Sequence, residues 1–136
     1  MIQSIENGMI YFLSLVPAGF PSPAADYVQE VIDLNKFFKV HSPSRFMVRV
    51  IGDSMIGALI TDNSLLMVDR AIIPQHNSIV VATVNGEQTV KRYSSIDGII
   101  SLVPANPKYK PIVITEGMTL EVEGVVTEII TSTKYV

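Results

Sequence analysis

Hydrophobic and polar residues alternate along most of the chain after residue 44, which is the pattern of strands with one face in a core. In the first run, apolar Phe46, Val48 and Val50 alternate with two arginines and a methionine. Further runs with strand character cover residues 64–69, 78–84, 87–93, 99–104, 112–115 and 120–131. Clusters of turn-forming residues separate them. The pattern therefore predicts a mostly β fold.

The clearest turn signal is Asn85-Gly86, which lies between two of these runs. This dipeptide favours a two-residue type I′ turn, because both residues tolerate a positive φ. Such a turn fixes the register of the hairpin and places Val80 opposite Lys91.

The same register surrounds Lys91 with small neighbours, since Ala82 and Thr89 fall on its face of the hairpin. An ammonium group that loses contact with water has a lowered pKa, because desolvation disfavours the charged form. The alternative is a lysine whose long side chain reaches water at a sheet edge.

The residues before the strands predict a different organisation. Residues 1–16 are apolar and suggest a loosely structured arm that lies on the domain or on a second copy. They do not fit a secretory signal, because the first basic residue is Lys36, and the run is too short to span a bilayer. After Tyr27 the pattern predicts a short extended piece and a helical turn near residues 35–40, with Phe37 and Phe38 directed inward.

Three prolines and a glycine fall within residues 16–25, which predicts an extended and exposed segment. Within it, Ala18 and Gly19 offer little steric bulk on either side of one peptide bond. Exposed, extended backbone is what a peptidase cleft accepts, so this bond is a candidate cleavage site. The alternative interpretation is an inert hinge.

The stretch Gly52-Asp53-Ser54-Met55 follows directly on the first predicted strand. Glycine and aspartate form turns, and a serine on such a turn presents its hydroxyl near backbone N–H groups. The alternative is that Asp53 or Ser54 only caps a short turn.

Composition narrows the function classes. The chain has 136 residues, which is about one domain, and 48% hydrophobic against 17% charged residues suggests surface buried in self-association. A net charge of −3 and the lack of a basic run argue against direct, sequence-specific DNA binding. The absence of cysteine and the presence of only two histidines, His41 and His76, argue against a thiolate or zinc site; we expect no metal and assign these histidines no chemistry.

A turn serine, a strand lysine and an exposed Ala-Gly bond can together make a hydrolase without histidine. Neutral lysine accepts the serine proton, and backbone N–H groups hold the oxyanion. With these features the chain resembles the UmuD-type members of the LexA-like family of self-cleaving Ser-Lys peptidases, and the resemblance extends from about Val16 to the C-terminus. The stretches that carry the resemblance are residues 18–27, Gly52-Asp53-Ser54-Met55, Thr89-Val90-Lys91-Arg92, and Leu102-Val103-Pro104-Ala105-Asn106 with Tyr109 and Pro111.

The resemblance implies a site and a fold. It implies Ser54 as nucleophile, Lys91 as general base and Ala18–Gly19 as the scissile bond, with the backbone N–H groups of Asp53 and Ser54 as the oxyanion hole. The implied fold is a single LexA/UmuD-like peptidase domain of twisted, partly barrel-like antiparallel sheets with one or two short helices. Residues 1–26 would be the arm with the cleavage segment, and residues 27–136 the peptidase and dimerisation domain. No cofactor or metal is implied.

The resemblance also implies a cytoplasmic role in the SOS response to DNA damage. A RecA filament on single-stranded DNA would stimulate self-cleavage, and the shortened homodimer would become an accessory subunit of a UmuC-type, Y-family translesion polymerase. We expect no helix-turn-helix domain before the cleavage segment and no contact with a membrane. The alternative is a non-catalytic dimeric module that binds the polymerase and whose peptidase site has decayed.

Overall fold

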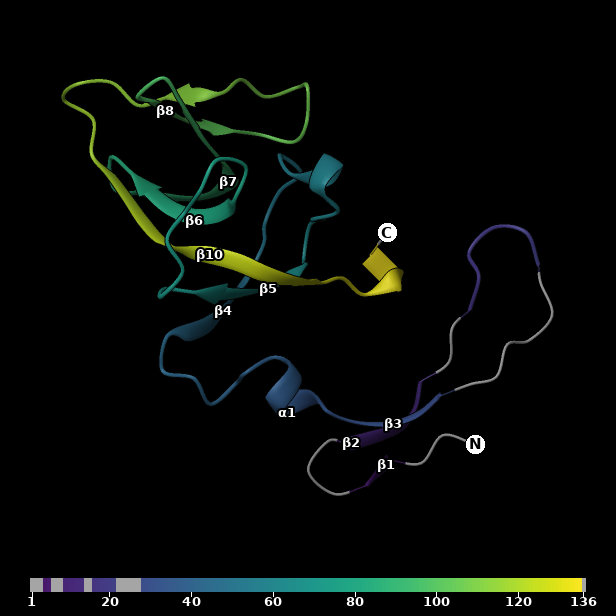
Figure 1. Cartoon of the computed structure of the whole chain (residues 1–136). Coiled ribbons are helices and arrows are strands. Elements are labelled where there is room, and N and C mark those ends of the chain that lie inside the picture. Colours follow the sequence, from purple (N-terminus) through teal and green to yellow (C-terminus); the bar gives the residue numbers. More distant parts are fainter. Residues whose placement is uncertain (1–3, 6–8, 14–15, 22–27, 136) are drawn as a thin grey trace. The chain divides into compact units, whose positions relative to one another are not determined.

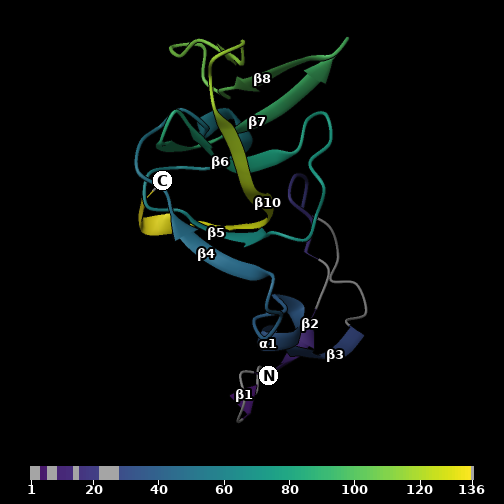
Figure 2. The same cartoon turned by 90° about the vertical axis from the view of Figure 1, so that its left-hand side faces the viewer.

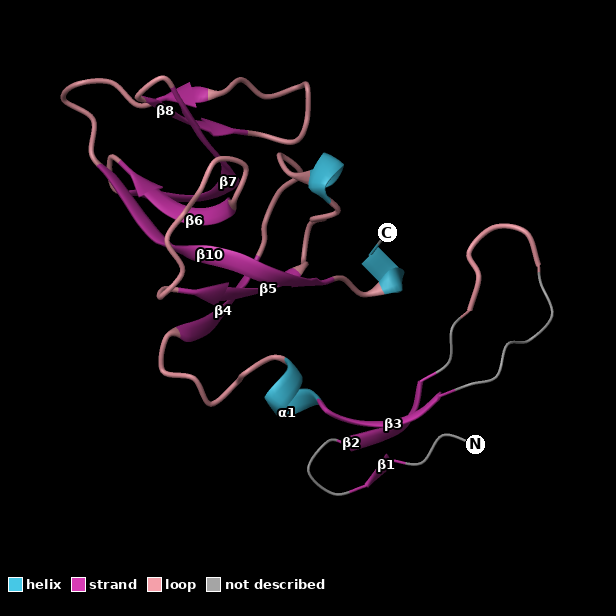
Figure 3. Cartoon of the chain, viewed as in Figure 1, coloured by secondary structure: helices cyan, strands magenta, loops and turns pink. Residues whose placement is uncertain are grey.

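The computed structural model describes residues 4–5, 9–13, 16–21 and 28–135 (Figure 1). The chain divides into two compact units, Met1–Ser42 and Pro43–Val136. Strands dominate the described residues (Figure 3). Their helices are short: α1 covers Leu34–Phe37, and the 3-10 turns η1 and η2 cover Ile56–Ala58 and Thr133–Tyr135. The prediction of a mostly β fold is confirmed.

The first unit contains a three-stranded antiparallel sheet in the order β1-β2-β3. Its strands are β1 (Ser4–Ile5), β2 (Met9–Leu13) and β3 (Val28–Asp33). Leu13 pairs with Val28, so the residues between them connect the two strands of a hairpin. Helix α1 follows β3 directly, and the carboxylate of Asp33 caps it by accepting the N–H of Asn35 at 3.0 Å.

Two expectations for this unit are wrong. Within the expected loose arm, residues 4–5 and 9–13 form strands β1 and β2, because β1 pairs with β2 and β2 pairs with β3, which satisfies backbone groups. Phe37 is 60% exposed and not directed inward, since a helix of one turn buries only part of its surface; Phe38 is half-buried. The division expected after residue 26 stays a prediction, while the compact units divide later because β2 and β3 pair.

The second unit is built on a seven-stranded sheet in the order β4-β5-β10-β6-β7-β8-β9, with all neighbours antiparallel. Each strand lies largely within a run predicted from the sequence, although β7 continues past Tyr93. The strands are β4 (Arg45–Arg49), β5 (Leu65–Asp69), β6 (Ile79–Val84), β7 (Glu87–Ile96), β8 (Ile99–Val103), β9 (Ile112–Val113) and β10 (Leu120–Ile130).

Strand β10 joins the two halves of this sheet (Figure 2). Its first half pairs with β6 and its second half with β5, with a bulge in each ladder. Bulges bend a strand and increase its twist. At the crossing point, Gly124 lets β10 approach β5 closely, since a Cβ there would lie 2.6 Å from Cγ1 of Val68.

Because the sheet bends in this way, both faces of β6 are covered. Val81 lies in a core cluster with Leu66 and Val68, whereas Val80 and Ala82 lie in a second cluster with further apolar side chains. Neighbouring residues of a strand point to opposite faces. The middle of β6 is therefore buried on both sides and gives β7 a firm support.

The β6–β7 hairpin turns at Asn85 and Gly86, whose φ angles of 49° and 84° fit a type I′ turn. Val80 pairs with Lys91 as the sequence predicts, and the register holds along the whole hairpin. The position of Lys91 on the sheet is thus fixed by a turn encoded in two residues.

A buried ionic cluster ties β4, β5 and β10 together around Arg45. The Arg45 side chain is only 7% exposed, and its guanidinium lies 3.2 Å from the carboxylates of both Asp69 and Glu128. It also donates to the hydroxyl of Thr127 at 3.0 Å. The alternating pattern places Arg45 on the polar face of its strand, and the neighbouring carboxylates explain how its side chain can be buried there.

Candidate active site

The candidate nucleophile stands on a turn that leaves the end of β4. Val50 is buried and exchanges backbone hydrogen bonds with Asn63 and Ser64 at 2.8 and 2.9 Å. Gly52 then adopts a φ of 101°, which favours glycine, and its N–H donates to the carboxylate of Asp62 at 2.8 Å. The turn that carries Ser54 is therefore held on its upstream side.

A loop after β8, residues 104–109, holds the downstream side of the turn. The N–H of Ala105 donates to the carbonyl oxygen of Ser54 at 2.9 Å, and the N–H of Gly57 donates to the carbonyl oxygen of Ala105 at 2.7 Å. Gly57 is needed for this approach, because a Cβ at position 57 would lie 2.6 Å from the Ala105 oxygen.

Two side chains of the same loop form hydrogen bonds to Asp53. The buried amide of Asn106 donates to the carbonyl oxygen of Asp53 at 2.9 Å. The hydroxyl of Tyr109 donates to the carboxylate of Asp53. That hydrogen bond, reinforced by the charge of the carboxylate, raises the pKa of Tyr109.

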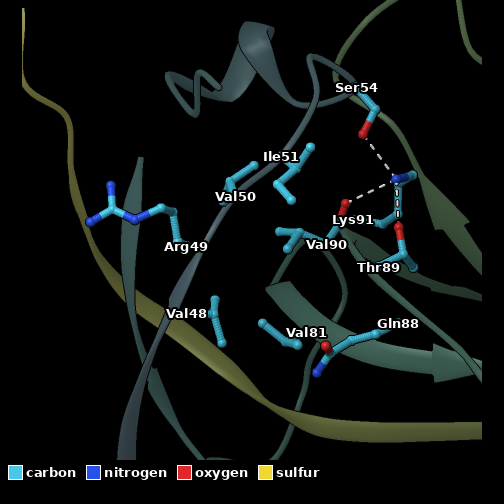
Figure 4. A pocket seen from close by; sticks show the side chains of 10 residues that line it. All are labelled: Val48, Arg49, Val50, Ile51, Ser54, Val81, Gln88, Thr89, Val90 and Lys91. Carbon is cyan, nitrogen blue, oxygen red and sulfur yellow. Dashed lines mark hydrogen bonds between the residues drawn. The ribbon is translucent and has the colours of Figure 1, made fainter. Parts of the chain in front are cut away.

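Lys91 reaches the serine from β7 (Figure 4). Its Nζ lies 2.9 Å from Oγ of Ser54, 2.7 Å from Oγ1 of Thr89 and 3.1 Å from the carbonyl oxygen of Val90. Burial lowers the pKa of Lys91, because desolvation disfavours the ammonium. The predicted direction of this shift is confirmed.

A neutral amine can make the same three contacts. A neutral lysine has two N–H donors and one lone pair, whereas Thr89 and Val90 each offer an oxygen acceptor. When both N–H groups are donated to these oxygens, the lone pair remains for the hydroxyl hydrogen of Ser54. The arrangement can therefore draw a proton from the serine.

A cavity of about 300 Å³ adjoins this pair and runs between the end of β4 and the start of β7. Its volume is at the lower end of the range for ligand pockets. Its wall mixes apolar side chains with the two hydroxyls and the amine (Figure 4). The lining residues are Val48, Arg49, Val50, Ile51, Ser54, Val81, Gln88, Thr89, Val90 and Lys91.

The backbone N–H groups predicted for the oxyanion hole have no hydrogen-bond acceptor within the part of the chain that the structure describes. Among the hydrogen bonds of residues 28–135 and the shorter described segments, none is donated by the N–H of Asp53 or Ser54. Free N–H groups beside a nucleophilic oxygen can stabilise a developing negative charge. They are available to a substrate carbonyl.

Ala18 and Gly19 belong to the other compact unit, within residues 16–21, which are all exposed. The structure brings Ser54 and Lys91 together in the second unit, whereas the candidate cleavage bond is in the first unit. Sequence reasoning gave no role to Thr89 or Asn106. The period of two places Thr89 on the face of Lys91 and could have revealed it; the contact of Asn106 is not visible in any local pattern.

His76 accepts the N–H of Ser95 at 3.2 Å through Nδ1. The described part of the chain contains no group of three or more His, Cys, Asp or Glu residues that could hold a metal ion. None of its helices is long and apolar enough to cross a membrane.

Comparisons with known proteins identify the family of the chain. The model of the Peptidase S24-like family matches residues 3–127. Protein SamA of Salmonella typhimurium is 42% identical over 132 residues, which cover 97% of this chain and 91% of SamA.

Other relatives match over a smaller part of their own length. The LexA repressor of Syntrophotalea carbinolica is 38% identical over 126 residues, which cover 92% of this chain and 61% of the repressor. Protein MucA of Escherichia coli is 40% identical over 82 residues, which cover 60% of this chain and 56% of MucA. The chain therefore belongs to the Peptidase S24-like family, as a LexA-like peptidase of the UmuD type.

Proposed function

We propose that the chain is a self-cleaving serine peptidase with Ser54 as nucleophile and Lys91 as general base. The observation that carries the proposal is the 2.9 Å contact between Nζ of Lys91 and Oγ of Ser54. A lowered lysine pKa supports it, because a base must be neutral to accept a proton near the operating pH. Membership of a peptidase family supports the reaction class.

The reaction follows from these atoms. Lys91 takes the proton from Ser54 as Oγ attacks the carbonyl carbon of Ala18, and the N–H groups of Asp53 and Ser54 bind the oxyanion. The C–N bond then breaks, and the proton passes from Lys91 to the amine of Gly19. Water, activated by neutral Lys91, hydrolyses the ester between Ser54 and Ala18.

The assignment of the bond to Ala18–Gly19 is supported by exposure and by size. Both residues lie in an exposed segment, and Phe20 beside them is 93% exposed. The segment belongs to the connection between β2 and β3, so a cut there would separate β1 and β2 from the rest of the chain. Cleavage would thus detach a peptide that contains strands β1 and β2.

The biological setting is proposed from the relatives. Similarity to SamA, MucA and LexA supports a role in the SOS response, in which a RecA filament on single-stranded DNA stimulates cleavage in the cytoplasm. The product, residues 19–136, would act as a homodimer and as an accessory subunit of a UmuC-type, Y-family polymerase in translesion synthesis.

The test of the peptidase assignment is mass spectrometry of the purified full chain after long incubation, with and without RecA, ATP and single-stranded DNA. The wild type should give a fragment that begins at Gly19, while Ser54→Ala and Lys91→Ala should stay intact and folded. Cleavage by Ser54→Ala would remove the dyad assignment. If the wild type stayed intact under every condition, the alternative function, a non-catalytic module that binds the polymerase, would be favoured.

A separate experiment tests whether cleavage switches the chain into an active accessory subunit of the polymerase. A chain that begins at Gly19 should support translesion synthesis without activation. Full-length Gly19→Lys should stay uncut with RecA, because a long charged side chain beside the bond obstructs the cleft, whereas Gly19→Ala should still be cut. If the chain that begins at Gly19 were no more active than uncut Gly19→Lys, the switch would have to be abandoned.

A further inference from the structure

We propose that Asn106 is a positioning residue that orients and strengthens the oxyanion-binding N–H of Ser54. The inference rests on the proposed function and extends it to a residue outside the dyad. The starting point is that the carbonyl oxygen of Asp53 and the N–H of Ser54 belong to one peptide unit. That unit is planar and trans, so its oxygen and its N–H point in opposite directions.

Asn106 fixes this peptide unit from its oxygen end. Its side-chain amide donates to the Asp53 oxygen at 2.9 Å, and the only other donor to that oxygen among the described residues is the N–H of Ile56 at 3.4 Å. When the oxygen is held, the direction of the Ser54 N–H is held as well. A donor that is fixed before the reaction does not need to reorganise when charge develops.

The hydrogen bond also acts on the strength of the donor. Hydrogen bonds in a chain polarise one another, so an amide whose oxygen accepts a bond becomes a better donor through its N–H. Asn106 is buried and its bond to Asp53 is part-buried, where such polarisation is stronger than in water. The hydrogen bond from Asn106 to the Asp53 oxygen therefore both orients the N–H of Ser54 and makes it a stronger donor.

Asn106 is itself held in place. It is 6% exposed, and its side-chain oxygen accepts the N–H of Lys108 at 3.0 Å. The preceding residue, Ala105, donates to the carbonyl oxygen of Ser54, so one loop pins the peptide units on both sides of the nucleophile. This arrangement explains why the site needs an asparagine.

Asparagine has a donor and an acceptor on a short side chain, and both are used here. Aspartate has nearly the same shape, but its ionised carboxylate only accepts and would face the Asp53 oxygen with repulsion. Asn106→Asp is therefore the sharp variant, and Asn106→Ala removes the side chain altogether. Tyr109→Phe is the matched control, because it breaks a bond to the Asp53 side chain and leaves the peptide unit untouched.

The experiment measures self-cleavage rates from neutral to alkaline pH for the wild type and these three variants. Asn106→Asp and Asn106→Ala should lower the alkaline plateau roughly 10- to 100-fold, since loss of a whole oxyanion donor costs about 10²- to 10³-fold. The pH at the midpoint of the rate profile should stay the same as in the wild type, because no contact of Lys91 changes. Tyr109→Phe should lower the plateau by only about threefold, the small end of the effect of one hydrogen bond, because the bond it removes does not involve the peptide unit.

An NMR measurement makes the test independent of cleavage. In the uncut Lys91→Ala background, the amide proton and nitrogen signals of Ser54 should move upfield when Asn106 is also changed to Ala, as expected for a less polarised N–H. If either Asn106 variant fails to fold, Asn106→Ser provides a smaller donor for both measurements. An unchanged plateau and an unchanged Ser54 signal would overturn the inference, as would an equal loss in Tyr109→Phe. Cleavage by Ser54→Ala would instead overturn the proposed function.

Discussion

Nζ of Lys91 lies 2.9 Å from Oγ of Ser54, although 37 positions separate the two residues. Two independent features bring them together. The Asn85-Gly86 turn fixes Lys91 on the hairpin, and the loop of residues 104–109 holds the serine turn. The pair is thus assembled by hydrogen-bonded backbone on both sides, which is what a reaction that depends on geometry requires.

Thr89 should matter for cleavage because it accepts an N–H of Lys91 at 2.7 Å and so helps to aim the lone pair at Ser54. Thr89→Val, which keeps the shape and loses the acceptor, should lower the cleavage rate about tenfold, the cost of one hydrogen bond. Thr89→Ser should retain most of the rate. Equal rates for the valine and serine variants, measured by densitometry over time, would contradict this role.

Lys91 should make the fold less stable at neutral pH than a variant with an apolar residue there. Its pKa is lower in the folded than in the unfolded chain, so the unfolded chain binds more protons between the two pKa values and stability rises with pH. The stability advantage of Lys91→Met over the wild type should therefore be largest at neutral pH and shrink as the pH approaches 10.5. Chemical denaturation at several pH values measures this.

The exposed Lys110 provides the control for that experiment. Lys110→Met should show a difference from the wild type that changes little with pH. A Lys91→Met difference that is constant across the same range would show that the pKa of Lys91 is not lowered by folding.

Asp69 should stabilise the fold at neutral pH and lose this effect in acid. Its pKa is lowered first by the N–H of Ala71, then by Ser44 and by the charge of Arg45. A lowered carboxyl pKa gives stability that is present above the unfolded value and lost as the pH falls through the folded value. Asp69→Asn should therefore be less stable than the wild type at pH 7, and the two should converge in acid.

The exposed Asp97 serves as the comparison, because it lies in a turn with a φ of 51° that asparagine also adopts. Asp97→Asn should match the wild type at every pH in thermal unfolding. If Asp69→Asn behaved in the same way, the charge of Asp69 would contribute no net stability.

Gly57 should be intolerant of a side chain, for steric reasons alone. A Cβ there would lie 2.6 Å from the carbonyl oxygen of Ala105, which is backbone and cannot rotate away. Gly57→Ala should lower the free energy of unfolding by about 1–3 kcal/mol, the usual cost of overpacking. It should also slow cleavage, because the loop that holds Ser54 must move. Unchanged unfolding and cleavage would show that this contact is not needed.

Local sequence signals predicted much of the site. The period of two and the Asn85-Gly86 turn were enough to place Lys91 opposite Val80, because a two-residue turn leaves one register. The alternation of apolar and polar residues also predicted the strand that ends before Gly52. Such features depend on neighbours in the sequence, and so they can be inferred from it.

Other features depend on contacts between distant segments. The hydrogen bond from Asn106 to Asp53 spans 53 positions, and the buried environment of Arg45 comes from Asp69 and Glu128. No local pattern encodes such partners. In the same way, the pairing of β2 with β3 was not predicted, because a long connection hides a hairpin whose turn has no two-residue signature.

The most direct test of the account is the rate at which the fragment beginning at Gly19 forms as a function of pH. Because only neutral Lys91 can accept the proton of Ser54, the rate should rise with pH through the lowered pKa of Lys91, below the ordinary value of 10.5, and then level off. A rate that peaks near neutral pH and falls on the alkaline side, while circular dichroism shows that the protein is still folded, would contradict the assignment of Lys91 as the base.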